Sequence, residues 1–130
     1  GTTELYMRTS SLLQIVLVFV MGQALAAPPM VVAGNTVEIA DQVFLIPDLG
    51  VPLVPNVGII VGQKGVMVVD TGMGPANAEI VLAEARRLTD LPIRYLVCTH
   101  FHPEHTFGAQ SFPEDTLILR KRQRRSWDCK

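Results

Sequence analysis

The strongest constraint on the fold is an apolar, β-branched run that ends directly in a cluster of histidines. Residues 93–98 read Ile-Arg-Tyr-Leu-Val-Cys, a pattern typical of a buried strand. All three histidines of the sequence follow at once, in the stretch His100-Phe101-His102-Pro103-Glu104-His105. Imidazole nitrogens and carboxylate oxygens suit zinc, with iron or manganese as alternatives. The stretch therefore predicts a metal site in the loop after a buried strand.

The spacing within this stretch divides the candidate ligands into two pairs. Residues two apart in an extended chain point the same way, so His100 and His102 are predicted to face one ion. Pro103 forces a turn, and Glu104 and His105 return from its far side toward a second position.

The remaining chain predicts short strands, tight turns and one main helix. The segment Gly62-Gln63-Lys64-Gly65 joins two apolar runs and indicates a hairpin. Because these two runs are continuously apolar, we expect both of their faces to be covered. Strands are predicted at residues 37–39, 43–46, 57–61, 66–69, 93–98 and 116–119. The expected fold class is α/β (α+β) with a mostly mixed sheet.

The main helix is expected at about residues 75–89, after Asp70-Thr71-Gly72 closes the preceding strand. Pro75 suits a first helical turn. An apolar stripe predicts the buried side, and Glu84, Arg86 and Arg87 are expected to be solvated. Residues 106–112 are predicted to form a short helix or loop that packs its phenylalanines under the site.

The motif at residues 100–105 resembles the H-x-H-x-D-H signature of the metallo-β-lactamase-fold hydrolases. The strand followed by Asp70-Thr71-Gly72 resembles a second recurring element of that family. The resemblance implies an αββα sandwich, of which residues 37–119 match the first half. It implies that His100 and His102 help to bind one zinc, that Glu104 and His105 help to bind another, and that Asp70 orients ligands beside the metal.

The family usually has aspartate where this chain has Glu104. Glutamate is one methylene longer, so the loop must shift, or Glu104 must bind differently or act only as a proton shuttle. The His100 and His102 position is therefore the stronger candidate. The resemblance implies a hydrolase with one or two zinc ions, whose activated water attacks an ester, thioester or amide of a small-molecule substrate.

The N-terminal part predicts a secretory signal peptide at residues 7–26. Arg8 supplies the positive charge, an apolar stretch follows, and Ala24-Leu25-Ala26 fits a cleavage site. Residues 1–6 are then a leader or an artefact upstream of the start. We expect an exported protein, periplasmic or secreted, without stable membrane insertion after cleavage. With this signal, the motifs also resemble exported zinc hydrolases associated with quinoprotein and sulfur-oxidation systems.

Charge separates an acidic body from a basic end. Residues 27–119 carry 4 basic and 10 acidic side chains, and residues 120–130 carry 6 basic and 1 acidic. Nucleic-acid or anionic-membrane contact are alternatives for this end. Since it lacks a periodic apolar face, we expect a disordered tail and no nucleic-acid partner.

The two cysteines leave their pairing open. Cys98 and Cys129 allow one disulfide in an oxidising compartment, although a buried thiol and an incidental tail thiol are favoured. Cys98 as a metal ligand is a weaker alternative.

No histidine follows His105, whereas the family completes its sites from a second half of the domain. Residues 27–119 are thus expected to form a partial domain. The alternative to a hydrolase is a truncated, inactive exported fragment with weak or no metal binding. Self-association through the exposed half-sandwich, with ligands from two chains, is a third hypothesis.

Overall fold

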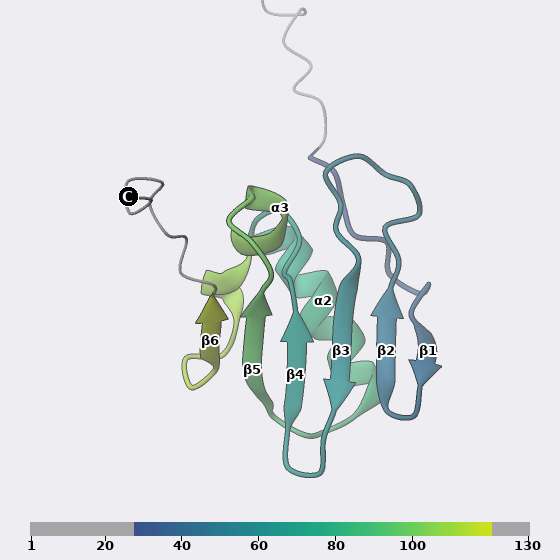
Figure 1. The fold of residues 1–130 in the computed structure, drawn as a ribbon, viewed down its shortest axis with the longest axis vertical. Coiled ribbons are helices and arrows are strands. Elements are labelled where there is room, and N and C mark those ends of the chain that lie inside the picture. Colours follow the sequence, from purple (N-terminus) through teal and green to yellow (C-terminus); the bar gives the residue numbers. More distant parts are fainter. Residues whose placement is uncertain (1–27, 121–130) are drawn as a thin grey trace, which may run out of the picture.

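The computed structural model describes residues 28–120, which form one mixed sheet with a main helix on one face and a short helix at the end of the strands (Figure 1). The elements in chain order are β1 (Val37–Ala40), β2 (Val43–Ile46), β3 (Val57–Val61), β4 (Val66–Val69), α2 (Pro75–Leu88), β5 (Ile93–Cys98), α3 (Pro103–Thr106), the short 3-10 helix η1 (Ala109–Ser111) and β6 (Leu117–Arg120).

The six strands lie in the sheet in the order of the sequence. β1 to β4 pair antiparallel, with short turns between β1 and β2 and between β3 and β4 and a longer loop at residues 47–56 between β2 and β3. β4, β5 and β6 pair in parallel, because α2 carries the chain back between β4 and β5 and the segment with α3 and η1 does so between β5 and β6. The carboxyl ends of β4, β5 and β6 therefore meet at one edge.

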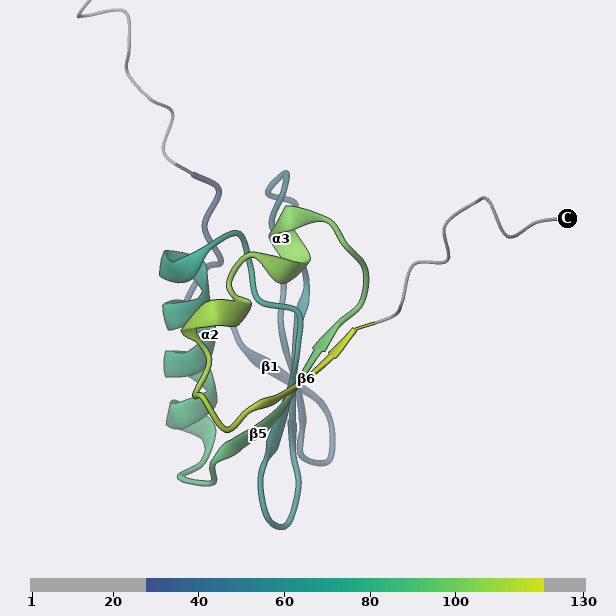
Figure 2. The ribbon, with the colours of Figure 1, turned by 90° about the vertical axis from the view of Figure 1, so that its left-hand side faces the viewer.

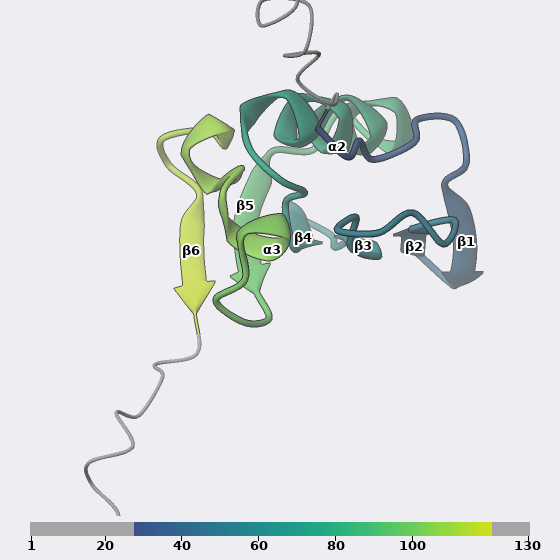
Figure 3. The ribbon, with the colours of Figure 1, turned by 90° about the horizontal axis from the view of Figure 1, so that it is seen from above.

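One face of the sheet is covered by α2, as the views in Figures 2 and 3 show. The central residues of this face, Ile59, Val68 and Leu96, are fully buried. They belong to one core with Ala78, Val81, Leu82 and Ala85 of the helix. The α/β architecture and the mixed sheet expected from the sequence are confirmed.

The opposite face of the sheet is apolar but uncovered by residues 28–120. Strand register places one unbroken row of residues across it: Val37, Leu45, Gly58, Val69, Val97 and Leu119. A second row includes Ile60, Tyr95 and Leu117, all of them exposed. The expectation of covering on both faces is not met within the described residues, because the main helix α2 covers the other face.

Four sequence expectations can be compared with the structure residue by residue. The helix at Pro75–Leu88 matches its predicted range. Glu84, expected to be solvated, is only 6% exposed, because Arg87 and two groups of the segment before β1 pair with it. Phe112 is buried as expected, but Phe107 is 59% exposed. Arg120, assigned to a disordered tail, is instead the last residue of β6.

The predicted leader, signal peptide and basic tail (residues 1–6, 7–26 and 121–130) fall outside the described residues, as does Cys129. Within residues 28–120, none of the helices has the length and apolarity needed to cross a membrane.

Candidate metal centre

The candidate site lies at the edge of the sheet where β4 and β5 end. Asp70 directly follows β4, and Thr99 directly follows β5. The loop after Thr99 leads into α3, which begins at Pro103 and carries Glu104 and His105 in its first turn. The parallel pairing of β4 and β5 thus brings together two motifs that lie 30 residues apart in the sequence.

Asp70 is the buried centre of this edge, with 3% of its surface exposed. Its φ of 68° lies in the left-handed region, which aspartate tolerates better than most residues. The backbone N–H of Asp70 donates to the Val97 carbonyl at 2.8 Å, which joins the turn to β5. Strained backbone of this kind concentrates at functional sites, and here it directs the carboxylate toward the end of β5.

Thr99 connects Asp70 to the histidines. Its backbone N–H donates to Asp70 Oδ1 at 2.9 Å, and its hydroxyl lies within 3.0 Å of both Asp70 oxygens. Asp70 Oδ2 also lies 2.7 Å from His105 Nδ1, and Thr99 Oγ1 lies 3.1 Å from His100 Nδ1.

These contacts determine which nitrogen of each ring is left for a metal. An ionised carboxylate only accepts hydrogen bonds, so the Thr99 hydroxyl and His105 Nδ1–H both donate to Asp70. The Thr99 oxygen then accepts from His100 Nδ1–H. Both rings are held with Nδ1 protonated, and the Nε2 lone pairs of His100 and His105 are left to bind a cation.

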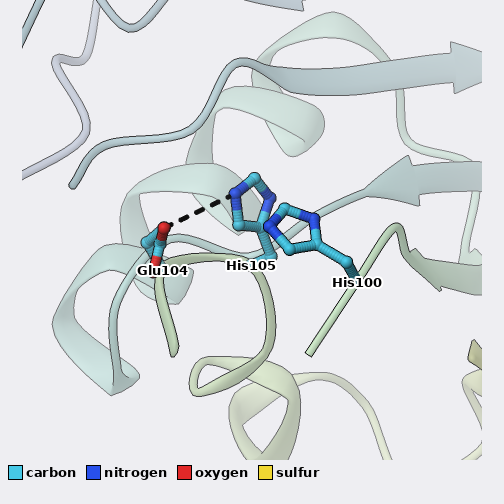
Figure 4. Close-up of side chains that lie close together, drawn as sticks. All are labelled: His100, Glu104 and His105. Carbon is cyan, nitrogen blue, oxygen red and sulfur yellow. Dashed lines mark ion pairs between the residues drawn. The ribbon is translucent and has the colours of Figure 1, made fainter. Parts of the chain in front are cut away.

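The side chains of His100, Glu104 and His105 converge, as Figure 4 shows. One ligand atom from each lies within 4.8 Å of the other two, and His105 Nε2 lies 3.8 Å from Glu104 Oε1. Zinc bonds of about 2.0–2.2 Å require ligand atoms about 3.3 Å apart in a tetrahedron. The group fits zinc after a small approach of the ligand atoms.

Electrostatics favour a cation at this point. The hydrogen bond from its own backbone N–H lowers the pKa of Glu104, and the neighbouring His102 and His105 rings add to this effect. Glu104 is therefore an anion at neutral pH and is placed to act as a ligand.

His102 stands next to this group rather than within it. Its ring centroid lies 4.6 Å from that of His100, and its Nδ1 lies 3.5 Å from Glu104 Oε1. The structure thus brings one residue of the first predicted pair together with both residues of the second. Cys98 is a buried free thiol outside the group.

Asn77 on α2 supports the loop that carries Asp70. Its side-chain amide donates to the carbonyls of Met73 and Pro29, and its oxygen accepts from the Val31 N–H at 2.6 Å. Gly72, at φ 76°, packs so closely on Asn77 that a Cβ would lie 2.6 Å from the Asn77 Cβ. The helix therefore supports both the Asp-Thr-Gly turn and the segment that precedes β1.

Comparison with known proteins identifies the family. The family model described as the metallo-beta-lactamase superfamily matches residues 50–118, more than half of the chain. The chain belongs to the metallo-β-lactamase superfamily. The matched range contains Asp70, Thr99 and the whole histidine motif.

Individual members of the superfamily match parts of the chain. A linear primary-alkylsulfatase from Pseudomonas sp. (strain ATCC 19151) is 43% identical over 60 residues, which are 46% of this chain and 11% of the enzyme. A crystal structure of a metallo-β-lactamase from Hirschia baltica superposes with a TM-score of 0.56 and 21% identity, over 67% of this chain and 42% of the other. The crystal structure of the metallo-β-lactamase FIM-1 from Pseudomonas aeruginosa in its mono-zinc form superposes with a TM-score of 0.56 and 20% identity. The match covers 72% of this chain and 44% of the other.

These similarities differ in what they establish. At this identity the two crystal structures establish the shared fold alone. The chain spans about a tenth of the alkylsulfatase and less than half of each crystallised enzyme.

The sequence did not assign a role to Thr99 or Asn77. Thr99 directly precedes the histidine motif, but one hydroxyl at that place does not reveal that it binds a carboxylate 29 residues earlier. Asn77 carried a usable signal, because a polar residue on the buried side of a helix must find hydrogen-bond partners.

Proposed function

We propose that this chain forms part of a zinc-dependent hydrolase whose metal is bound through His100, Glu104 and His105, with His102 as a further ligand. The convergence of the first three side chains on one point carries the proposal. The superfamily membership and the anionic state of Glu104 support it.

The residues of this chain have separable tasks in such a reaction. Asp70 holds His105 by its Nδ1 and, through Thr99, orients His100, so both rings present Nε2. Bound zinc would supply Lewis acidity that generates a nucleophile from water near neutral pH. Glu104 either binds the ion directly or carries a proton away from the attacking water.

Two substrate classes follow from different observations. The superfamily resemblance supports attack on the carbonyl of an ester, thioester or amide. The 43% identity to a linear primary-alkylsulfatase supports a sulfate ester of an alkyl chain as the second candidate.

Metal content tests the site directly. Residues 27–130 are purified, loaded with zinc, dialysed and analysed for metal, next to His100→Ala and His105→Ala variants. We expect about one zinc in the parent and a loss in each variant. Glu104→Ala should also lose zinc, and Glu114→Ala is its matched control, because Glu114 lies in the turn before β6, at the opposite end of the parallel strands.

Activity separates a hydrolase from a metal-binding but inactive chain. The zinc-loaded protein is assayed with 4-nitrophenyl acetate and with sodium dodecyl sulfate. Turnover that disappears in His105→Ala supports the proposal and names the substrate class. Retained zinc without turnover of any ester, thioester, amide or sulfate ester would show that the chain binds metal but is inactive. A failure to retain zinc would refute the metal site itself.

Export is a separate proposal, supported by the charge and apolar pattern of residues 7–26. N-terminal sequencing of the expressed protein is expected to begin near Ala27. A sequence that begins at Met7 would refute it.

A further inference from the structure

A cavity of about 150 Å³ opens directly beside the candidate metal group. Its lining residues are Cys98, His100, Phe101, Thr106 and Arg120. His100 belongs to both the cavity and the metal group, so the two adjoin. At about 30 Å³ per water molecule, the cavity has room for about five waters or one small polar group.

Arg120 reaches this cavity because of strand register. It is the last residue of β6 and pairs with Cys98 at the end of the parallel strand β5. Arg120 thus stands at the same edge of the sheet as the histidine motif, which follows two residues after Cys98. In residues 28–120, Arg120 has no ion-pair partner, whereas Arg87 and Arg94 are each paired with a carboxylate.

The formal charge among the residues that line the cavity is the positive charge of Arg120. The lining contains one guanidinium, one imidazole, one hydroxyl, one phenyl ring and one thiol, and no carboxylate. A guanidinium with a free fork of N–H donors matches the geometry of a carboxylate or sulfate group.

We propose that this cavity is a substrate subsite in which Arg120 binds an oxyanion group, a carboxylate or a sulfate, next to the metal ligand His100. The inference rests on the proposed hydrolase and narrows its substrates to molecules that carry a negative charge beside the bond that is cleaved. Phe101 supplies an apolar wall for the carbon atoms next to this group.

The subsite is tested by binding, without turnover and without metal. Amide NMR spectra of the metal-free chain are recorded during titration with sodium sulfate, sodium acetate and neutral acetamide, at ionic strength held constant with sodium chloride. We expect saturable shifts at Phe101, Thr106 and their neighbours with the anions but not with acetamide. The anion that saturates at lower concentration identifies the preferred group.

Variants assign the effect to the guanidinium. Arg120→Gln is expected to weaken anion binding about tenfold or more, since a charge-assisted pair is lost, and Arg120→Lys is expected to weaken it less. Arg86→Gln is the matched control, because it removes one exposed positive charge from α2, and it should change the affinity less than twofold. The spectra also show whether each variant is folded.

The subsite and the proposed function fail in different ways. Equal anion affinity in the parent and Arg120→Gln, or shifts that map elsewhere, would overturn the subsite. A separate zinc titration of the parent tests the metal site. If anion binding depends on Arg120 but the chain does not bind zinc, the proposed subsite is supported and the proposed hydrolase is refuted.

Discussion

Two buried carboxylates of this molecule have almost the same exposure but opposite roles. Asp70 at the end of β4 is 3% exposed, and Glu84 on α2 is 6% exposed. Glu84 pairs with the Arg87 guanidinium at 2.8 Å and also accepts from the Gly34 N–H and the Thr36 hydroxyl. Asp70 accepts from Thr99 and from His105, and no arginine or lysine pairs with it among residues 28–120.

The difference lies in what each network leaves unpaired. Both carboxylate oxygens of Glu84 are paired with other groups of the protein. Its hydrogen bonds therefore join the segment before β1 to α2 and have no part in the metal site. Asp70 holds the His105 ring directly and the His100 ring through Thr99, and both of these side chains converge with Glu104. A buried carboxylate therefore stabilises the fold when all of its hydrogen-bond partners are structural groups. It orients metal ligands when one of its partners is a histidine at the surface.

The largest expected effect comes from Asp70→Asn. The amide cannot accept from Thr99 and His105 as the carboxylate does, so both rings lose their orientation. Zinc affinity should fall about tenfold to a hundredfold, as for other residues that orient metal ligands. Competition with a chromogenic chelator measures it. Zinc affinity equal to that of the parent would show that Asp70 is a turn residue only.

Asn77→Ala should affect both regions, because Asn77 contacts the Asp-Thr-Gly loop and the segment before β1. The variant leaves the buried Val31 N–H without its partner. The free energy of unfolding should fall by about 2 kcal/mol in urea titrations. Zinc affinity should fall less than tenfold, because the loop loosens but Asp70 keeps its partners. A larger loss of zinc affinity than in Asp70→Asn would reverse the proposed ranking.

Glu84→Gln should destabilise the chain without changing zinc affinity. The side chain keeps its size, but the amide has one accepting oxygen instead of two and lacks the charge that pairs with Arg87, at a cost of about 1–2 kcal/mol at pH 7. Equilibrium urea unfolding measures the cost, and the zinc titration supplies the contrast with Asp70→Asn.

The same variant predicts a dependence on pH. Burial raises the pKa of Glu84, but the hydrogen bonds from Arg87, Thr36 and Gly34 outweigh it and hold the pKa below its ordinary value. The stabilisation is therefore complete above the unfolded-state pKa of about 4.3 and is lost as the pH falls through the lower folded-state pKa. The difference in stability between parent and variant should shrink from pH 7 to pH 3, and a constant difference would contradict the assignment.

The sequence predicted the fold better than it predicted these networks. Strand runs such as residues 57–61 and 93–98 are apolar and β-branched, and Pro75 indicates the start of the helix, so local patterns were sufficient. Glu84 was assigned to solvent because a charged residue beside two arginines looks solvated. Its burial depends on Thr36, 48 residues away, and no local pattern records such a contact.

The candidate site likewise has a part that the sequence predicted and a part that it did not. The histidine motif was found from residue types and spacing, and the role of Asp70 came from the family resemblance. The hydrogen bonds of Thr99 and the placement of Arg120 beside His100 come from the parallel pairing of β4, β5 and β6. Register between strands is set by the whole sheet, so a single strand does not reveal which residues will share its end.

The smallest effect is expected for Arg94→Ala, which removes an exposed ion pair that belongs to no buried hydrogen-bond network. Arg94 Nη1 lies 2.8 Å from Asp115 Oδ2, and both side chains are about half exposed or more, at 49% and 66%. Water and salt screen such a pair, so the free energy of unfolding should change by less than about 0.5 kcal/mol in urea. The short distance matches that of the Arg87 and Glu84 pair, so a negligible cost here next to a measurable cost for Glu84→Gln would show that burial, and not separation, decides the contribution. A cost above about 1 kcal/mol for Arg94→Ala would instead place this pair among the structural networks of the molecule.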